Sequence, residues 1–380
     1  MVNLWLIFFL IRVNSCNSWL VFEMNVAIIG CGLIGQKRAQ ALGAARLVAC
    51  ADLALDRAKA LAQTVPGAIA IRDWRSAICR QDVHIVIVAT TNDALAEVTR
   101  AAVQAGKHVL VEKPAARNVG ELDQVIAAAR QAGVQVRVGF NHRYHPAFRQ
   151  ARALFQAGAL GEMMFVRGRY WHGGRIGYDK EWRANPDLSG GGELIDQGVH
   201  LIDLARWFLG DFSEVTGFAH TYFWQMPVDD NGFMLLKTRQ HQVAFLHVSC
   251  TEWKNLFSFE IYGRDGKLHI EGLGGSYGVE RLAYYKMLPQ MGPPETTIWE
   301  YPMRDDSWQI EFAEFLEDIR LGRPPSANLA DARAALLIVE QIYAQSRNPQ
   351  YATRNTQYAT RNSQHAIRNL KSKIQNDNHP

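Results

Sequence analysis

Asp196 and His200 are the two side chains of this sequence best placed to do acid and base chemistry together. They lie four residues apart in Gly190-Gly-Gly192-Glu-Leu-Ile-Asp196-Gln-Gly-Val-His200, a spacing that puts two side chains on one face of a helix. A near-neutral imidazole can take a proton from a hydroxyl group, and a neighbouring carboxylate can orient it and stabilise its charged form. The triple glycine suggests close backbone approach, with a ligand as one candidate. On its own, such a pair is more often structural.

Lys113 is a third candidate, because it follows a short apolar strand. The segment AGKHVLVEKP at residues 105–114 places Lys113 at the carboxyl end of the strand predicted at 109–111, and ligands of open α/β sheets bind at that edge. A lysine there could hydrogen-bond a substrate hydroxyl and stabilise a developing alkoxide. Pairing with Glu112 or with solvent is the alternative for this lysine taken alone.

A glycine-rich loop supplies the pattern for a dinucleotide cofactor. It reads Gly30-Cys-Gly32-Leu33-Ile34-Gly35, after a strand predicted at 26–29 and before a helix predicted from residue 36. The first glycine allows a tight turn, the second lets a pyrophosphate approach the backbone, and the third lets helix and strand pack closely. The phosphates would then sit at the helix N-terminus.

Asp52 ends the second predicted strand, 22 residues after Gly30. A carboxylate there can accept hydrogen bonds from the adenosine ribose hydroxyls. This favours NAD over NADP, because a 2′-phosphate would meet a like charge. Arg57 is near enough in sequence to weaken the preference, so NADP stays possible.

The approach to the glycine-rich helix is crowded with aromatic and basic residues. They are Arg167, Arg169, Trp171, His172, Arg175, Tyr178, Trp182 and Arg183. Aromatic rings stack on sugar faces, and arginines hold phosphate or carboxylate groups. We expect a sugar, cyclitol or nucleotide-sugar substrate, with Arg169, Trp171, Trp182 and Arg183 among its contacts. The alternative is that the tryptophans are core and the arginines solvated.

These residues need a scaffold, and the apolar pattern predicts one with two domains. Short apolar strands alternate with helices from residue 24 to about 144, which indicates a doubly wound parallel sheet, an NAD(P)-binding Rossmann domain. Strand-like stretches between 214 and 301, several joined by glycine turns, indicate a mostly antiparallel open sheet in an α+β substrate domain at 145–346. The predicted fold class is therefore α/β.

The two ends differ in character from the middle. Residues 1–23 hold a short apolar run without a preceding basic segment, and we expect an extension outside the fold. Residues 347–380 carry a seven-residue repeat and are expected to be disordered. The tail alone has a formal charge of +5. Because the whole chain has a formal charge of +4, the rest of the chain sums to −1. This balance gives no argument for nucleic-acid binding.

The five cysteines are scattered, without a CxxC pair. That pattern indicates neither a disulfide framework nor a zinc site, and it suits a reducing compartment. We expect a cytoplasmic protein that needs no metal and does not act at a membrane.

Four motifs together are similar to those of the Gfo/Idh/MocA oxidoreductases, which include glucose-fructose oxidoreductase and inositol dehydrogenase. They are GxGxxG, AGKHVxxEKP, Val138-Gly-Phe-Asn141-His-Arg143-Tyr and GGGxxxDxGxH, and the resemblance runs from about Met24 to Gln345. It implies that Lys113 contacts substrate, that Asp196 is the family's aspartate and that His200 is the acid/base. It also implies cofactor contacts at Thr90, Asn92, Glu112, Lys113 and Asn141, a cis peptide at Lys113–Pro114, and subunit contacts through the outer face of the second sheet.

One motif departs from the family pattern. Where the family commonly has Ala-Thr-Pro-Asn-x-x-His, this chain has Ala89-Thr-Thr91-Asn92-Asp-Ala-Leu95. This departure falls on the nicotinamide-side contacts that the resemblance implies at Thr90–Asn92.

The resulting hypothesis is an NAD(P)-dependent dehydrogenase that moves hydride between nicotinamide and a ring carbinol of a sugar, cyclitol or nucleotide sugar. A homo-oligomer is expected. Two alternatives stay open: redox-neutral glycoside hydrolysis with bound NAD, and a metabolite-sensing regulator on the same scaffold.

Overall fold

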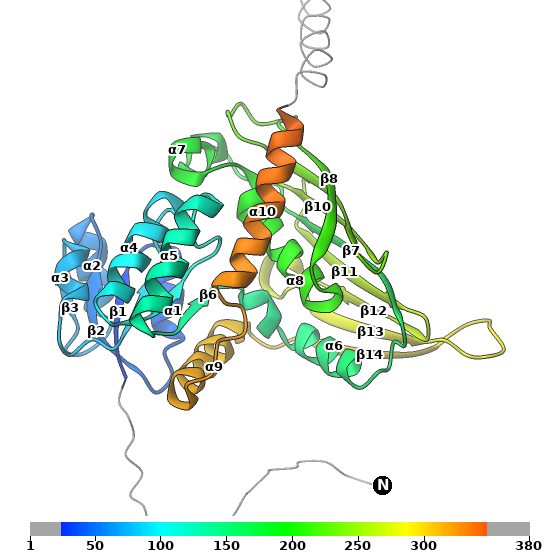
Figure 1. The fold of residues 1–380 in the computed structure, drawn as a ribbon, viewed down its shortest axis with the longest axis horizontal. Coiled ribbons are helices and arrows are strands. Elements are labelled where there is room, and N and C mark those ends of the chain that lie inside the picture. Colours follow the sequence, from blue (N-terminus) through cyan, green and yellow to red (C-terminus); the bar gives the residue numbers. More distant parts are fainter. Residues whose placement is uncertain (1–23, 348–380) are drawn as a thin grey trace, which may run out of the picture.

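The computed structural model describes residues 24–347, which form two sheets with helices between and around them (Figure 1). The expected N-terminal extension and nearly all of the expected disordered tail lie outside the described residues. No helix between residues 24 and 347 has both the length and the apolar character needed to cross a bilayer.

The first sheet is parallel and has the strand order β3-β2-β1-β4-β5-β6. This is the order of a dinucleotide-binding Rossmann fold, and it confirms the predicted doubly wound sheet. Its elements are β1 (Asn25–Ile29), α1 (Leu33–Gln40), β2 (Arg46–Ala51), α2 (Leu55–Ala62), β3 (Ile69–Ile71), α3 (Trp74–Ile78), β4 (Ile85–Val88), α4 (Asn92–Gln104), β5 (His108–Val111), α5 (Val119–Ala132) and β6 (Val136–Val138). Neither β3 nor α3 was predicted from the sequence.

The second sheet has eight strands in the order β14-β13-β12-β11-β7-β10-β9-β8, and only the β7–β10 pair is parallel. The predicted mostly antiparallel open sheet is confirmed. Its strands are β7 (Met163–Trp171), β8 (Phe212–His220), β9 (Asn231–Thr238), β10 (Val243–Ser249), β11 (Leu256–Gly263), β12 (Gly266–Glu271), β13 (Glu280–Lys286) and β14 (Glu295–Tyr301).

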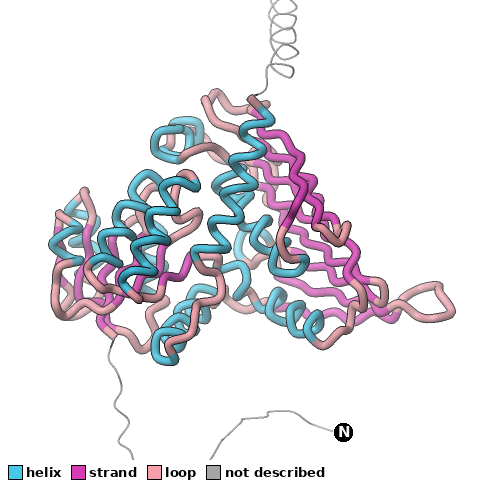
Figure 2. The backbone as a smooth tube through the Cα atoms, viewed as in Figure 1, coloured by secondary structure: helices cyan, strands magenta, loops and turns pink. Residues whose placement is uncertain are grey.

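Three helices cover one face of the eight-stranded sheet, and the opposite face stays bare (Figure 2). They are α6 (Pro146–Gln156), α8 (Val199–Leu209) and α10 (Leu329–Ser346). Two further helices, α7 (Pro186–Ser189) and α9 (Ser307–Leu321), lie against the Rossmann domain. The short 3-10 turns are η1 (Asn141–Tyr144), η2 (Tyr178–Lys180), η3 (Trp182–Ala184) and η5 (Gly275–Tyr277). Along β7, exposed Arg167 and Arg169 alternate with buried Val166 and Tyr170, because successive side chains of a strand point to opposite faces.

The helix predicted from about Glu193 to Phe208 is not uniform. It begins as a π-helical turn, η4 (Leu194–Gly198), and continues as α8. A π turn closes on the fifth residue instead of the fourth, so residues four apart no longer stand one above the other. This change affects the Asp196 and His200 pair.

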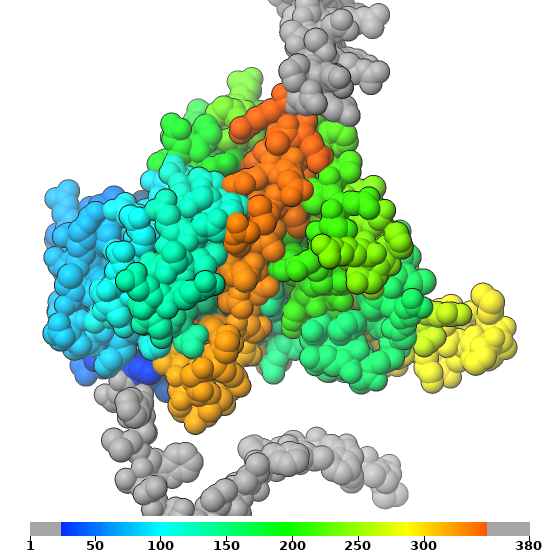
Figure 3. Space-filling model, viewed as in Figure 1, coloured from blue at the N-terminus to red at the C-terminus, as the bar shows by residue number. Residues whose placement is uncertain are grey.

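The last two helices connect both halves of the molecule (Figure 3, orange). Phe312 and Phe315 of α9 are buried against Val26 and Ile28 of β1, on one face of the Rossmann sheet. In α10, Leu336 belongs to the larger core that also holds residues of both sheets. The chain thus returns from the second sheet to cover the first.

Candidate active site

The glycine loop has the geometry that a pyrophosphate requires. Gly30 has φ +93, and a Cβ there would collide with the backbone of Ala89, so only glycine fits. A Cβ on Gly35 would collide with the Gly30 carbonyl, whereas one on Gly32 would meet no atom within 4 Å. The open space therefore lies at Gly32, the N-cap of α1, where a phosphate group would meet free backbone N–H groups.

A cavity of about 980 Å³ extends from this loop. Gly30, Gly32, Leu33, Ile34, Asp52 and Thr90, all predicted cofactor contacts, line it. Asp52 accepts hydrogen bonds from the Cys31 and Ala54 N–H groups at 2.8 Å each, which fixes its carboxylate at the edge of the cavity. These residues fit the adenosine and pyrophosphate parts of NAD.

A second cavity, of about 470 Å³, shares Ile34, Thr90, Arg183 and Asp196 with the first. The other predicted cofactor contacts, Asn92, Glu112, Lys113 and Asn141, line this second space together with His200. The two cavities therefore meet where a nicotinamide ring would lie between dinucleotide and substrate. Gly35 packs beneath the loop and lines neither of these cavities.

Lys113, Asp196 and Arg183 form a compact charged group. Lys113 Nζ donates to Asp196 Oδ1 at 2.5 Å and to the Asp196 carbonyl at 2.6 Å, and Arg183 Nε donates to Asp196 Oδ2 at 2.9 Å. Burial opposes ionisation of Asp196, but the two cations outweigh it and hold its pKa below the ordinary value. The Lys113–Pro114 bond is cis, as the resemblance implied.

His200 lies in the same cavity but is not oriented by Asp196, which corrects the expected pairing. Both carboxylate oxygens of Asp196 are taken by Lys113 and Arg183, and His200 Nδ1 is buried without a hydrogen-bond partner. Because the chain is π-helical at Asp196, the spacing of an α-helix does not bring the two side chains together. Burial, and then the charges of Lys113 and His145, lower the pKa of His200 well below 6.5, so the ring is neutral at pH 7.

Two of the predicted substrate contacts, Arg169 and Trp171, do not reach this cavity. Trp182 and Arg183 line it, but Arg169 and Trp171 do not. Arg169 is exposed on β7, and the Trp171 ring contacts His247 of β10. Residues 169 and 171 share the outer face, whereas Tyr170 between them points into the cavity, as the two-residue period of a strand requires.

The triple glycine is needed for packing within the protein and not for a ligand. A Cβ on Gly191 would collide with the Tyr343 hydroxyl, and one on Gly192 with the Asp229 carbonyl. Asp229 also accepts hydrogen bonds from the Gly192 and Leu194 N–H groups, each at 2.8 Å. These contacts fix the start of η4 and so the place of Asp196.

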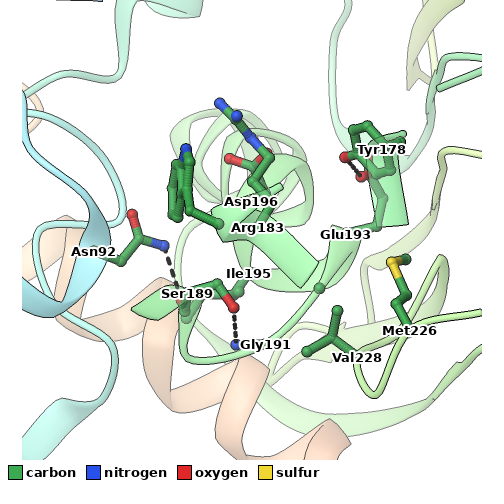
Figure 4. Close-up of a pocket in the computed structure, with 12 residues that line it drawn as sticks. Asn92, Tyr178, Arg183, Ser189, Gly191, Glu193, Ile195, Asp196, Met226 and Val228 are labelled. Atoms are coloured by element: carbon green, nitrogen blue, oxygen red, sulfur yellow. Dashed lines mark hydrogen bonds and ion pairs between the residues drawn. The ribbon is translucent and has the colours of Figure 1, made fainter. Parts of the chain in front are cut away.

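Figure 4 shows how the Rossmann domain meets this turn. Asn92, at the start of α4, donates from Nδ2 to the Ser189 carbonyl at 2.9 Å. Asp196 and Arg183 point toward one another above it. Leu95, where the family commonly has histidine, is fully buried in the core, so this position takes no part in the cavity.

Sequence reasoning missed several residues that line the second cavity. They are His142, His145, Tyr170, Gln197, Asp305 and Trp308. His142 and His145 could have been predicted, since His142 lies within the Asn141 motif, His145 directly follows it, and histidines are common in such sites. Asp305 and Trp308 follow β14, more than 100 residues after Lys113, and only the return of α9 to the Rossmann domain brings them here.

Comparison with known proteins agrees with the fold. Residues 24–140 match the model of an oxidoreductase family with an NAD-binding Rossmann fold, and residues 148–269 match the GFO/IDH/MocA C-terminal domain. A levoglucosan dehydrogenase of Pseudarthrobacter phenanthrenivorans is 33% identical over 229 residues, which cover 57% of this chain and 59% of that protein. An inositol 2-dehydrogenase of Salmonella typhimurium is 24% identical over 314 residues, covering 80% of this chain and 88% of that enzyme.

A solved structure extends the agreement over most of the chain. A levoglucosan dehydrogenase in complex with NADH and levoglucosan superposes with a TM-score of 0.76 at 25% identity, covering 85% of this chain and 97% of that one. The matched domains, the strand order of the Rossmann sheet and the glycine loop agree on one family. The chain belongs to the Gfo/Idh/MocA family of NAD-binding oxidoreductases.

Proposed function

We propose that this protein is an NAD-dependent dehydrogenase that oxidises a secondary hydroxyl group of a neutral sugar or cyclitol. The observation that carries the proposal is that Lys113, Asp196 and His200 line one cavity, and that this cavity adjoins the larger cavity at the glycine loop. The relatives named for levoglucosan and inositol support this class of substrate.

Each residue of this group has a part in the reaction. Lys113 Nζ would donate a hydrogen bond to the substrate oxygen and stabilise the alkoxide as it forms. Asp196 keeps that ammonium group in place by accepting its hydrogen bond at Oδ1, while Arg183 fixes the same carboxylate by donating to Oδ2. Neutral His200 would take the hydroxyl proton. Bound NAD supplies the acceptor for the hydride that leaves the same carbon.

The charges around the second cavity favour a neutral substrate. Arg183 is bound to Asp196, and Arg175 to Glu181 at 2.7 Å, so neither is left to hold a phosphate. Arg167 and Arg169 lie on the outer face of the sheet. Trp182 and Trp308 line the cavity and offer rings for stacking on a sugar face. None of these four arginines is therefore placed to hold the diphosphate of a nucleotide sugar, and Lys37 is the cation of this cavity that could contact one phosphate group.

A substrate panel tests this proposal. The full chain with NAD would be given levoglucosan, myo-inositol, other neutral monosaccharides, and nucleotide sugars, and NADH would be followed by its absorbance. We expect NADH only with neutral rings, and loss of turnover in His200→Ala. Turnover confined to nucleotide sugars would contradict the neutral substrate.

We also propose a homo-oligomer formed through the bare face of the eight-stranded sheet. Leu235 and Phe245 on that face are each 51% exposed, and an apolar surface of this kind marks an interface. Sedimentation velocity should show a dimer or larger species, and Phe245→Glu should shift it toward the monomer. A monomeric wild-type protein at micromolar concentration would contradict this.

A further inference from the structure

The orientation of His200 must come from a residue other than Asp196. Among residues 24–347, no carboxylate makes a hydrogen bond or ion pair with His200. Instead, the imidazole of His142 lies flat against it, with ring centroids 3.9 Å apart and an interplanar angle of 27°. Phe140 meets the His200 ring edge-on at 5.9 Å. The ring is thus held by other rings.

His142 is itself held by a hydrogen bond through its Nδ1, whereas its Nε2 is buried without a partner. Its Nδ1 lies 3.2 Å from Asn141 Oδ1, while Asn141 Nδ2 donates to Ser307 Oγ at 3.1 Å. The amide therefore presents its oxygen to His142, and Nδ1 carries the hydrogen in the neutral ring. Ser307 begins α9, so the helix that covers the Rossmann sheet also fixes the ring that packs on His200.

We propose that His142 is a positioning residue, which holds the His200 ring in a fixed orientation and keeps water away from one of its faces. The inference rests on the proposed function, because it gives His200 a partner for the proton transfer assigned to it. A buried, stacked imidazole is pre-organised to receive a proton, and proton transfer depends strongly on such geometry.

The surroundings of His200 show why a neutral stacked ring suits this position. The charged and titratable groups around it are Lys113 at the end of β5, His142 and His145 at η1 and the start of α6, Tyr170 on β7, and Asp196 on η4. Lys113 repels an imidazolium, and Asp196 is already neutralised. A carboxylate against His200 would favour its charged form, which cannot act as a base.

The test compares two substitutions of His142 in the full-length protein. His142→Ala opens one face of the His200 ring to water, so we expect kcat for oxidation to fall about tenfold or more, with KM changed much less. The acid limb of the pH profile should also move up toward pH 6.5, because hydration favours the charged ring. His142→Phe keeps a stacked ring, so it should restore most of kcat and return the acid limb to its wild-type position.

The outcomes separate this inference from the proposed function. An alanine variant with the wild-type kcat and pH profile would overturn it. So would a phenylalanine variant that binds NADH normally yet is as slow as alanine, because the ring nitrogen and not the stack would then matter. If the alanine variant fails to fold, the pH profile of the phenylalanine variant decides. If wild-type protein reduces NAD with no member of the panel, the proposed function fails instead.

Discussion

Lys113 links the two halves of the proposed chemistry, because its ammonium group binds Asp196 through both the carboxylate and the carbonyl. The lysine comes from a Rossmann strand and the aspartate from the π-helical turn of the second domain. At the residue scale, the site consists of the Lys113 ammonium group, which is bound to the Asp196 carboxylate, and the neutral imidazole of His200.

Replacing this lysine should remove most of the activity. In Lys113→Ala no ammonium group remains to stabilise the alkoxide, and we expect kcat to fall by about 10²–10³. The matched control is Lys59→Ala on α2, whose exposed side chain pairs with Asp56 and lies outside both cavities. Steady-state kinetics of both variants, with NADH binding as a check on folding, would decide. A loss of less than threefold in Lys113→Ala would contradict the assigned role.

The state of His200 predicts an asymmetric pH dependence. Burial lowers its pKa well below 6.5, so the neutral base is present at all higher pH values. Oxidation should therefore keep its rate as pH falls from 8 to 6.5 and lose it only as pH drops through the lowered pKa. The reverse reaction, reduction of the ketone by NADH, needs the protonated His200 ring. The rate of reduction should therefore fall as pH rises above that pKa. Measured kcat profiles in both directions test this, and an oxidation limb at or above pH 6.5 would contradict it.

At the scale of elements, β1, the glycine loop and α1 form one unit in which each glycine has a different task. Gly35 lets the helix pack on the loop, and Gly32 leaves open space for a phosphate. The sequence predicted this division of tasks because it depends on local geometry. The place of Asp196 was harder to predict, since a π turn fixed by Asp229 interrupts the helix.

Two alanine substitutions in this loop should act on different quantities. Gly35→Ala forces a Cβ into the Gly30 carbonyl, so it should lower the free energy of unfolding by about 1–3 kcal/mol or more. Gly32→Ala meets no atom, so stability should be nearly unchanged while NADH binds more weakly. Denaturant unfolding and NADH titration separate the two effects. Equal losses of stability in both variants would show that the loop is not built in this way.

The sequence predicted elements better than contacts between them. The buried β-branched run 85–88 and the alternating strands of the second sheet were readable because their periods are local. Arg169 and Trp171 were misplaced because composition does not show which face of a strand looks inward. Asp305 and Trp308 were missed because their place depends on the return of α9.

At the scale of the whole molecule, α9 joins cofactor domain and substrate cavity. Arg38 of α1 is fully buried and binds Glu112 at 2.6 Å and Glu311 of α9 at 2.5 Å. Glu112 precedes Lys113, so this network connects the cofactor helix, the catalytic strand and the last part of the chain. The two domains are therefore expected to unfold as one unit.

Removing a large side chain of α9 tests that coupling. Phe315 is fully buried against the Rossmann sheet, so Phe315→Ala should cost about 3–5 kcal/mol. Leu321 on the same helix is 50% exposed, and Leu321→Ala should cost less than about 0.5 kcal/mol. Thermal unfolding of the full chain should stay a single transition in both. A separate early transition in Phe315→Ala would mean that the domains are independent.

We propose that hydride passes from the substrate to NAD with His200 as the base, and the stoichiometry of the reaction distinguishes this chemistry from glycoside hydrolysis and from sugar binding alone. The full chain would be mixed with excess NAD and the best neutral substrate of the panel, and NADH and carbonyl product would be counted together. We expect one NADH for each ketone formed by the wild-type protein, and neither product in His200→Ala. Conversion of a glycoside to free sugar without NADH would contradict it, as would tight sugar binding without any turnover.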